Sequence, residues 1–433
     1  MKLARPPEFQ DVAGLVDVAS AGRAFPRPPG VALSYGVAGF RARAPLLEST
    51  LLRMGMLAAR RSAVMGYAVG LMVTASHNAE PDNGVKLVDV DGGMLHQSWE
   101  AYAAALANAD DGDLTSALAK LPGGSGAPGG AAERPSVLIA WDTRPSSERL
   151  AALAMRGAQL AGAQALTLGL LTTPQLHHIV RMSNGAAGCA AVGSRWGLPE
   201  WASEAGYYEM LAGAYAELVG VGERGAPAAV ASPLDVDCAC GIGAPAVERL
   251  AAALTAKLGA GAPALRVVNA PGSGELNTGC GAEHVQKARE PPRGLESVQA
   301  MVAGRAASLD GDADRIVFHY FTHAGGWALL DGDKIAALVA GFLREQLRSA
   351  LRGHTAPAAS APPRATPSTA ARPPRARSEE DEEEADGSEL RAAVVQTAYA
   401  NGASSAYLLG LGVEIAAAKT GVKFLHTQVW VWP

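Results

Sequence analysis

The sequence predicts an α/β fold built on mostly parallel sheets. Short apolar segments suited to buried strands alternate along the chain with longer segments of helical periodicity, which is typical of sheets with helices packed on their faces. The length of 433 residues is enough for two or more domains, each with its own core. Polar loops follow several of the apolar runs, and open α/β sheets bind their ligands at that edge.

The first alternating block covers about residues 45–170. A helical spacing of apolar residues begins after Pro45, a residue that suits a helix start. The turn signal Asp82-Asn83-Gly84 follows the first predicted strand. The expected elements are a helix over 45–63, a strand at 67–75, a helix opening at Ser98, a strand at 137–140, a helix over 147–161 and a strand at 165–170.

Two further alternating blocks follow, separated and interrupted by loop-like sequence. Residues 121–135 are a flexible surface insertion by composition, and residues 352–388 combine Pro/Ala/Arg-rich and acidic sequence that predicts a disordered, solvated insertion rather than a docking arm. The expected helices are 207–219, 246–258 and 334–347, and the expected strands are 234–239, 265–268, 306–309, 316–320 and 392–397.

Composition narrows the functional classes. Lys and Arg number 37 against 42 Asp and Glu, a net charge of −5, so we expect no broad basic surface for nucleic acid. The four cysteines lack zinc spacing and are expected to be buried, reduced thiols, which fits a reducing compartment. Because the N-terminus has no apolar signal segment and no stretch of about 18 residues is purely apolar, we expect a soluble cytoplasmic protein without membrane partners.

Three aspartates at alternate positions give the strongest chemical signal. Asp310, Asp312 and Asp314 are spaced by Gly and Ala and lie between apolar segments, which places them at a strand end. Ligation by oxygen alone suits Mg²⁺ rather than zinc. The alternatives are a solvated acidic turn and a calcium loop, although the EF-hand pattern fails because no glutamate occupies its closing position.

A polar loop after the strand predicted at 67–75 holds the candidate reactive residue. Ser76, His77 and Asn78 follow an apolar run, and Lys86 comes ten residues after the serine. A hydroxyl, an imidazole and a cation at one loop suit phosphate chemistry. The surroundings of Ser76 match neither the hydrolase elbow nor the phosphate loop of nucleotide-binding kinases. A lone serine at a strand end is usually a cap or turn residue, so its functional interpretation depends on the other motifs.

Several longer motifs occur in a fixed order and carry a resemblance. Residues 35–41, the Ser76 loop, residues 142–147 and the loop 310–315 occur in the order of the α-D-phosphohexomutase family, which the chain resembles. Segments 82–89, 171–177 and 395–402 are similar to its phosphoacetylglucosamine mutase branch. The resemblance covers nearly the whole chain outside the insertions.

The resemblance implies a role for each matching residue. Ser76 would be the phosphoserine, and its phosphate would join the three aspartates as a ligand of one Mg²⁺ per chain. A sugar 1,6-bisphosphate would be the intermediate and activator. The other expected site residues are Lys86, a candidate proton carrier, and Arg41, His77 and Arg315 beside the phosphoserine.

The resemblance also implies a domain plan of successive mixed-sheet α/β domains. We expect domain I at 1–195 with the serine loop, domain II at 196–303, and part of domain III at 304–433 with the metal loop and the insertion. The family's sugar-binding Glu-x-Asn-x-Gly loop and the phosphate-binding loop of its fourth domain are not found. Residues 427–433 depart from the family pattern, and a truncated transcript, a frameshift or a faulty gene model is the expected explanation.

The function implied by the resemblance is interconversion of N-acetylglucosamine 6-phosphate and N-acetylglucosamine 1-phosphate, for UDP-N-acetylglucosamine synthesis. The expected partners are small phosphosugars, and the expected state is a monomer or weak dimer. Two alternatives stay open. One is a phosphoglucomutase or phosphomannomutase, and the other is a catalytically impaired fragment that still binds metal.

Overall fold

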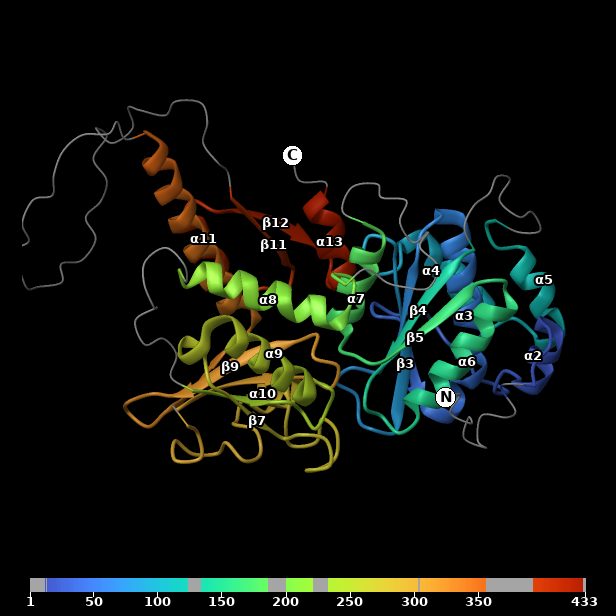
Figure 1. The fold of residues 1–433 in the computed structure, drawn as a ribbon, viewed down its shortest axis with the longest axis horizontal. Helices are drawn as coiled ribbons and strands as arrows, with labels where there is room; N and C mark the ends of the chain where they lie inside the picture. The colour runs from blue at the N-terminus through green and yellow to red at the C-terminus, as the bar shows by residue number, and fades with distance from the viewer. Residues whose placement is uncertain are drawn as a thin grey trace, which may run out of the picture. The chain divides into compact units, whose positions relative to one another are not determined.

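The computed structural model describes residues 12, 14–123, 134–185, 200–220, 233–302, 304–355 and 392–430. The chain divides into two compact units, Met1–Asp331 and Gly332–Pro433. Most of the insertion expected at 121–135, and most of that expected at 352–388, lies outside the described residues. Each unit is considered by itself below, and Figure 1 shows the elements of both.

The first sheet of unit 1 is a mixed five-stranded sheet in the order β1-β3-β2-β4-β5. Strand β2 is parallel to β4, and β4 is parallel to β5, whereas β3 is antiparallel to both β2 and β1. Every residue of β2 is buried, as expected for a central strand covered on both faces. The strand bounds are β1 (Phe40–Arg43), β2 (Val69–Val73), β3 (Asp82–Val88), β4 (Ser136–Trp141) and β5 (Gln164–Leu170).

Helices cover both faces of this sheet (Figure 1). The larger apolar core joins α3 (Glu48–Met65) and α6 (Ser147–Leu160) to one face, through residues such as Leu51, Met54 and Leu153. A smaller core joins α7 (Thr173–Ser183) to the other face. The remaining helices of this part are α2 (Val18–Ala24), α4 (Gln97–Ala107) and α5 (Leu114–Ala119).

The turn expected at Asp82-Asn83-Gly84 is wrong, because these residues begin strand β3. The chain turns just before them, where the Asp82 N–H donates to the Ala79 carbonyl at 3.1 Å. Gly84 is required by close packing rather than by a turn: a Cβ there would lie 2.4 Å from the Phe40 carbonyl oxygen and 2.7 Å from that of Thr74. The neighbouring strands therefore approach at Gly84, and the resulting strand carries Lys86.

The second sheet of unit 1 has the order β10-β9-β8-β6-β7 and is also mixed. Strand β6 is parallel to both β7 and β8, and β9 is antiparallel to β8 and β10. The strands are β6 (Leu234–Asp237), β7 (Leu265–Val268), β8 (Arg305–Leu309), β9 (Ile316–Phe321) and β10 (Trp327–Leu330). The helices of this part are α8 (Glu204–Leu218), α9 (Gly243–Leu258) and α10 (Ala282–Ala288).

The strand pairing differs from the expected domain boundary at residues 303–304. Strand β8 pairs with β6, for example Val236 with Ala307, so the aspartate loop after β8 belongs to the second sheet and not to a third domain. The sequence places the boundary between domains II and III too early, because the apolar segments that form β8 and β9 resemble the start of a new alternating block. Hydrogen bonding between strands that are distant in sequence decides the sheet to which they belong.

Unit 2 contains a two-stranded parallel sheet with helices. Strands β11 (Ala393–Thr397) and β12 (Glu414–Ala418) pair from Ala393 opposite Glu414, and α12 (Gly402–Gly410) connects them. Helix α11 (Gly332–Thr355) packs Ala337 and Ala340 against Leu408. Helix α13 (Val422–Trp430) follows β12.

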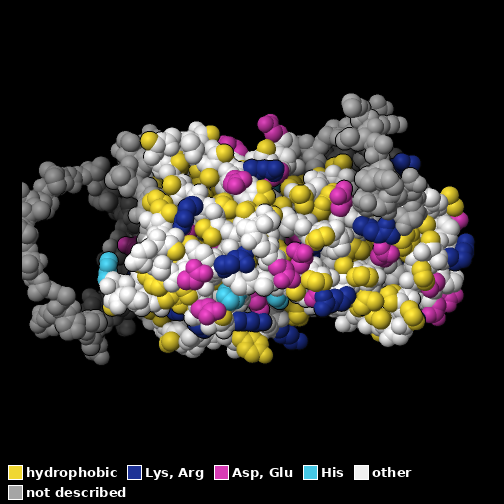
Figure 2. Space-filling view, turned by 90° about the horizontal axis from the view of Figure 1, so that it is seen from below, with side chains coloured by type: hydrophobic (Ala, Val, Ile, Leu, Met, Phe, Trp, Pro, Cys, Tyr) yellow, Lys and Arg dark blue, Asp and Glu magenta, His cyan; other side chains and the backbone are white. Residues whose placement is uncertain are grey.

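The surface charges and the thiols can be compared with the sequence where the structure describes them. On the face drawn in Figure 2, basic and acidic side chains are intermingled. Cys238, Cys240 and Cys280 are free and buried, which confirms the expectation for three of the cysteines, while Cys189 lies outside the described residues. Within the described part of the chain, no helix is long and apolar enough to cross a membrane.

Candidate active site

Ser76 lies on a tight loop just beyond the carboxyl end of β2. Its side chain is only 1% exposed, and its φ of 55° lies in the left-handed region that non-glycine residues rarely adopt. The Ser76 N–H donates to the Thr74 hydroxyl at 2.9 Å. This placement at a strand end confirms the expected position of the loop, and the backbone conformation implies that its surroundings hold it there.

A buried arginine fixes the carbonyls of this loop. The Arg144 guanidinium donates to the carbonyl oxygens of Ser76 at 3.0 Å, Asn78 at 2.9 Å and Ala79 at 2.7 Å. Its Nε donates to Asp142 at 3.0 Å, so the arginine itself is held by a fully buried ion pair. Arg144 and Asp142 of the motif at residues 142–147 therefore support the serine loop.

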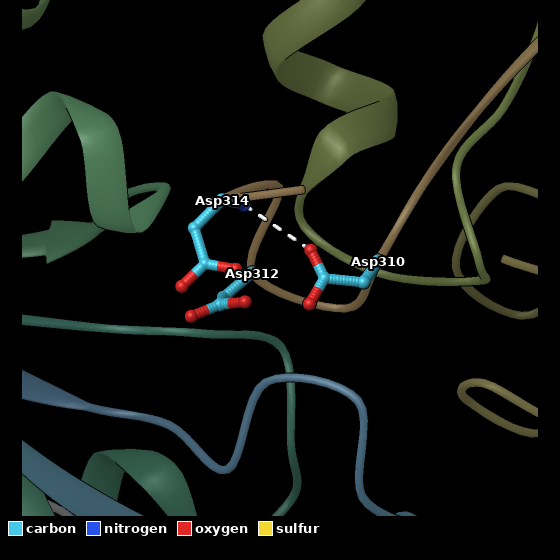
Figure 3. A group of neighbouring side chains, drawn as sticks. All are labelled: Asp310, Asp312 and Asp314. Carbon is cyan, nitrogen blue, oxygen red and sulfur yellow. Dashed lines mark hydrogen bonds between the residues drawn. The ribbon is translucent and has the colours of Figure 1, made fainter. Parts of the chain in front are cut away.

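The three aspartates lie on the loop between β8 and β9, and Figure 3 shows their carboxylates converging. One oxygen from each of them lies within 4.8 Å of the others. Asp310 Oδ1 accepts the N–H of Asp314 at 3.2 Å, marked in Figure 3, and that of Arg315 at 3.2 Å. These bonds curl the loop around Asp310, whereas Asp312 Oδ1 is buried and has no hydrogen-bond partner.

The structure brings the serine and the acidic loop into contact. Ser76 Oγ donates to Asp310 Oδ2 at 2.7 Å, although 234 positions separate the two residues in sequence. Arg315 reaches the same place, since its Nη2 lies 3.3 Å from Ser76 Oγ and its Nε donates to Asp310 at 3.1 Å. His77 Nδ1 contacts the Arg315 guanidinium and lies 3.4 Å from Ser76 Oγ. A hydroxyl, a carboxylate and a guanidinium thus meet at one point.

Lys86 approaches the acidic loop from the first sheet. Its Nζ lies 2.7 Å from Asp312 Oδ2 and 2.7 Å from Asp314 Oδ2, and its side chain is 2% exposed. Thr173, at the start of α7, donates its hydroxyl to Asp312 Oδ2 at 2.6 Å and its N–H to the Asp312 carbonyl at 3.1 Å. Arg41 lies further out and donates to the Asn78 side chain at 3.4 Å.

Burial and charge together set the protonation of these groups. Burial lowers the pKa of Lys86, but the carboxylates of Asp312 and Asp314 raise it more, so the net pKa lies above the ordinary lysine value. Burial, followed by the charges of the other two aspartates, raises the pKa of Asp310. Burial and the nearby Arg41 lower the pKa of Arg315 to about 10, which still leaves it charged at neutral pH. Lys86 and Arg315 are therefore cations facing three carboxyl groups.

The donor set fits a hard divalent cation. Asp310, Asp312 and Asp314 offer only oxygen, and Ser76 Oγ lies beside them. Asp312 Oδ1, buried without a partner, is the group whose burial is costly unless something binds it. A phosphoserine would add a charge of about −1.5 to −2 to this site. Lys86 and Arg315 could not balance the combined negative charge of the phosphate and the three carboxylates. The geometry therefore favours the Mg²⁺ expected from the sequence.

Sequence reasoning missed three residues that the structure places around the site. Asn277 donates to the carbonyl oxygens of Ser76 at 2.9 Å and Asn78 at 3.0 Å, and Glu283 accepts from Arg315 at 2.6 Å. Thr173 is the third. The capping box formed by Thr172 and Gln175 signals the helix that starts at Thr173, but the contact of Thr173 with Asp312 depends on packing between the sheets. Asn277 sits in a Gly/Ser/Thr-rich loop that gives no sequence signal.

Comparison with known proteins decides the family. Models of phosphoacetylglucosamine mutase AMG1 match residues 199–317 (domain II) and 377–431 (domain III), and the model of phosphoglucomutase/phosphomannomutase alpha/beta/alpha domain I matches 46–113 and 112–195. The chain is 39% identical to the phosphoacetylglucosamine mutase of Sus scrofa over 402 residues, which are 92% of this chain. This chain belongs to the phosphoacetylglucosamine mutase family.

Solved structures of the family share the fold. The N-acetylphosphoglucosamine mutase of Aspergillus fumigatus, in a serine-to-alanine variant with glucose 1,6-bisphosphate, superposes with a TM-score of 0.75 at 33% identity, covering 98% of this chain and 68% of that one. The same enzyme with GlcNAc-6P and magnesium gives 0.70 at 33% identity, over 96% and 68%. These structures confirm the predicted α/β phosphohexomutase class. The chain spans 63% of the length of the pig relative.

Proposed function

We propose that this chain is a phosphosugar mutase that interconverts N-acetylglucosamine 6-phosphate and N-acetylglucosamine 1-phosphate, with Ser76 as the phosphoryl carrier. The observation that carries the proposal is the 2.7 Å contact between Ser76 Oγ and Asp310, in a site that Arg315 and Lys86 also enter. The bound GlcNAc-6P and magnesium of the Aspergillus fumigatus relative support the substrate and the metal.

The reaction consists of two phosphoryl transfers with Ser76 at the centre. Phosphorylated Ser76 would give its phosphoryl group to the free hydroxyl of the sugar monophosphate, so the Oγ–P bond breaks, a sugar O–P bond forms and the hydroxyl proton leaves. The 1,6-bisphosphate then returns its other phosphoryl group to Ser76. Such transfers need in-line positioning and charge stabilisation. Arg315, beside Ser76 Oγ, supplies fixed positive charge, and Arg144 holds the loop in position.

Asp310, Asp312, Asp314 and the Ser76 oxygen would hold the Mg²⁺, which when bound neutralises charge on the transferring group. Lys86 is the candidate for accepting or returning the sugar hydroxyl proton. Its Nζ forms ion pairs with the buried Asp312 and the partly exposed Asp314, so accepting a proton would require Lys86 first to lose its own proton and at least one of these ion pairs. Arg41 and His77 complete the positive and polar rim of the site.

Turnover and Ser76 phosphorylation test the proposal together. Purified chain is incubated with Mg²⁺, glucose 1,6-bisphosphate and N-acetylglucosamine 6-phosphate; product is followed by NMR and Ser76 by peptide mass spectrometry. Ser76→Ala should lose both signals. Ser116→Ala is the matched control, because Ser116 is exposed on α5 and its hydroxyl donates to the Asp113 carbonyl rather than to a residue of the site. A folded wild-type chain without either signal would contradict the proposal.

The same assay separates the alternatives. Higher kcat/KM for glucose 1-phosphate or mannose 1-phosphate would indicate a phosphoglucomutase or phosphomannomutase. Mg²⁺ binding without phosphoserine formation would indicate an impaired metal-binding fragment. The two matched models of phosphoacetylglucosamine mutase domains favour the proposed N-acetylglucosamine phosphate mutase over these alternatives.

The proposal extends to the cellular setting. We infer that the protein acts in the cytoplasm as a monomer or weak dimer and supplies a step toward UDP-N-acetylglucosamine. The three buried free thiols support a reducing compartment.

A further inference from the structure

We propose that Asn277 is a positioning residue that holds the Ser76 loop against the acidic loop; this inference rests on the proposed function for its kinetic consequence. Asn277 lies between β7 and α10, in the second sheet's part of unit 1. Its Nδ2 donates to the carbonyls of Ser76 at 2.9 Å and Asn78 at 3.0 Å. Two carbonyl acceptors fix the orientation of the amide, because its oxygen would repel them.

The same two carbonyls receive bonds from both sides of the site. Arg144 bonds them from the first sheet at 3.0 and 2.9 Å, and Asn277 bonds them from the second. Ser76 needs this support because its φ of 55° is a conformation that costs energy in a serine. Arg144 can hold the loop in its own domain, but only a residue of the second sheet can hold it at a fixed distance from Asp310.

The Asn277 contact is anchored close to the metal loop. The Asn277 N–H donates at 2.9 Å to the carbonyl of Ala239, two residues after the end of β6. Strand β6 pairs with β8, which ends at the acidic loop. Gly311 of that loop packs so closely that a Cβ there would lie 2.6 Å from the Ser76 carbonyl oxygen and 2.9 Å from Asn277 Nδ2. Ser76, Gly311 and Asn277 thus form one tightly packed junction.

Most of the other polar links between the two sheets here use groups that the reaction itself would occupy. Ser76 Oγ would carry the phosphate, and the carboxylates that bind Lys86 and Thr173 would bind Mg²⁺. The Asn277 bonds involve only backbone carbonyls, which neither the phosphate nor the metal needs. They can therefore persist through the catalytic cycle while the side-chain contacts change.

Asn277→Gly tests this role, because glycine keeps the left-handed backbone (φ 59°) and removes the side chain that donates both bonds. Asn269→Gly is the matched control. Asn269 also has a positive φ of 54° and donates two bonds from its amide, to Asp237 at 2.9 Å and to the Arg293 carbonyl at 3.0 Å, but none to the Ser76 loop.

Two readouts are measured on the full chain with Mg²⁺. Hydrogen exchange of the Ser76 and Asn78 amides reports the loop without requiring turnover, and kcat and KM report its consequence. Asn277→Gly should speed exchange at these amides and lower kcat by roughly tenfold to a hundredfold, with little change in the sugar phosphate KM. Asn269→Gly should do neither, even if both variants lose similar stability.

The outcomes separate this inference from the proposed function. Equal exchange in the two variants, or an equal fall in kcat, would overturn the role of Asn277. An inactive wild-type chain would refute the proposed function, and the exchange comparison would then decide the Asn277 contact alone. Asn277→Asp gives a further check, since a carboxylate facing two carbonyls should loosen the loop at least as much as glycine does.

Discussion

The packing of α3 against α6 allows one substitution to be predicted in detail. Gly55 of α3 faces Ala154 of α6, and a Cβ built on Gly55 would lie 1.9 Å from the Ala154 carbonyl oxygen. On the other helix, a Cβ on Gly157 would lie 1.8 Å from the Leu52 carbonyl oxygen. Because carbon–oxygen contacts are about 3.3 Å or longer, Gly55→Ala must move the helices apart by about 1.4 Å. Both obstacles are backbone atoms, which no rotamer change can move.

The expected loss of stability follows from two opposing effects. Overpacking a well-packed core costs about 1–3 kcal/mol, and a clash with backbone belongs at the upper end of that range. Alanine recovers about 1 kcal/mol through its higher helix propensity. We therefore expect Gly55→Ala to lower the free energy of unfolding by about 2 kcal/mol. The double variant with Gly157→Ala should cost less than the sum, because one separation relieves both clashes.

Urea unfolding followed by circular dichroism measures this difference. Gly213→Ala is the matched control, because Gly213 is also inside a helix but a Cβ there meets nothing within 4 Å. The control should be stabilised by up to about 1 kcal/mol. If Gly55→Ala proves as stable as the Gly213 variant, the close approach of α3 and α6 is wrong, and with it the packing beneath the sheet that carries Ser76.

Three further predictions concern the site and its sheet. Lys86→Met should destabilise the metal-free protein by about 3–5 kcal/mol, because it removes the ion pair of the fully buried Asp312, and Mg²⁺ should restore part of this in thermal unfolding. Lys287→Met should change little, because Lys287 is exposed and its partner Glu283 keeps its ion pair with Arg315. Removing Mg²⁺ with EDTA should stop phosphoserine turnover and lower the melting temperature of wild type but not of Asp312→Asn, whose metal site is already weakened. Burial lowers the pKa of His319 from 6.5 to about 4, so between these pH values the unfolded chain binds a proton that the folded chain does not. The free energy of unfolding should therefore fall as the pH drops from about 6.5 to 4. Chemical denaturation at several pH values should show a shallower fall for His319→Gln.

Local patterns predicted the elements well and the long-range contacts poorly. The periodicity over 45–63 and the apolar run at 137–140 correspond to α3 and β4, because each pattern reflects the burial of a single element. The Asp82–Gly84 turn was wrong because Gly84 is needed where β3 packs closely against Phe40 of β1 and against Thr74, a long-range contact that a local sequence pattern does not reveal. The boundary at 304 failed for the same reason, since β8 takes its partner from the distant β6.

The sequence allowed the candidate reactive groups of the site to be predicted, but not the residues that hold them in position. Ser76 and the aspartates follow strands, and that position alone marks them as candidates. Their meeting across 234 positions depends on how the two sheets pack. Thr173 and Asn277 act through one hydroxyl and one amide whose residue types are ordinary in loops and helix starts, so only the folded contacts reveal them.

The acidic loop also resolves how three carboxylates can lie so close together. The sequence suggested that they would need a cation, and the structure shows protein groups bonding both oxygens of Asp310 while Asp312 Oδ1 has no hydrogen-bond partner. Asp312 and Asp314 give their Oδ2 atoms to Lys86, which leaves Asp312 Oδ1 without a partner and Asp314 Oδ1 only 3.8 Å from Arg315. Asp310 binds backbone N–H groups with Oδ1 and turns Oδ2 to Ser76. Lys86 and the backbone N–H groups that bond Asp310 therefore hold the loop in shape without a metal, and Asp312 Oδ1 is an oxygen that a divalent ion could bind without displacing a protein group.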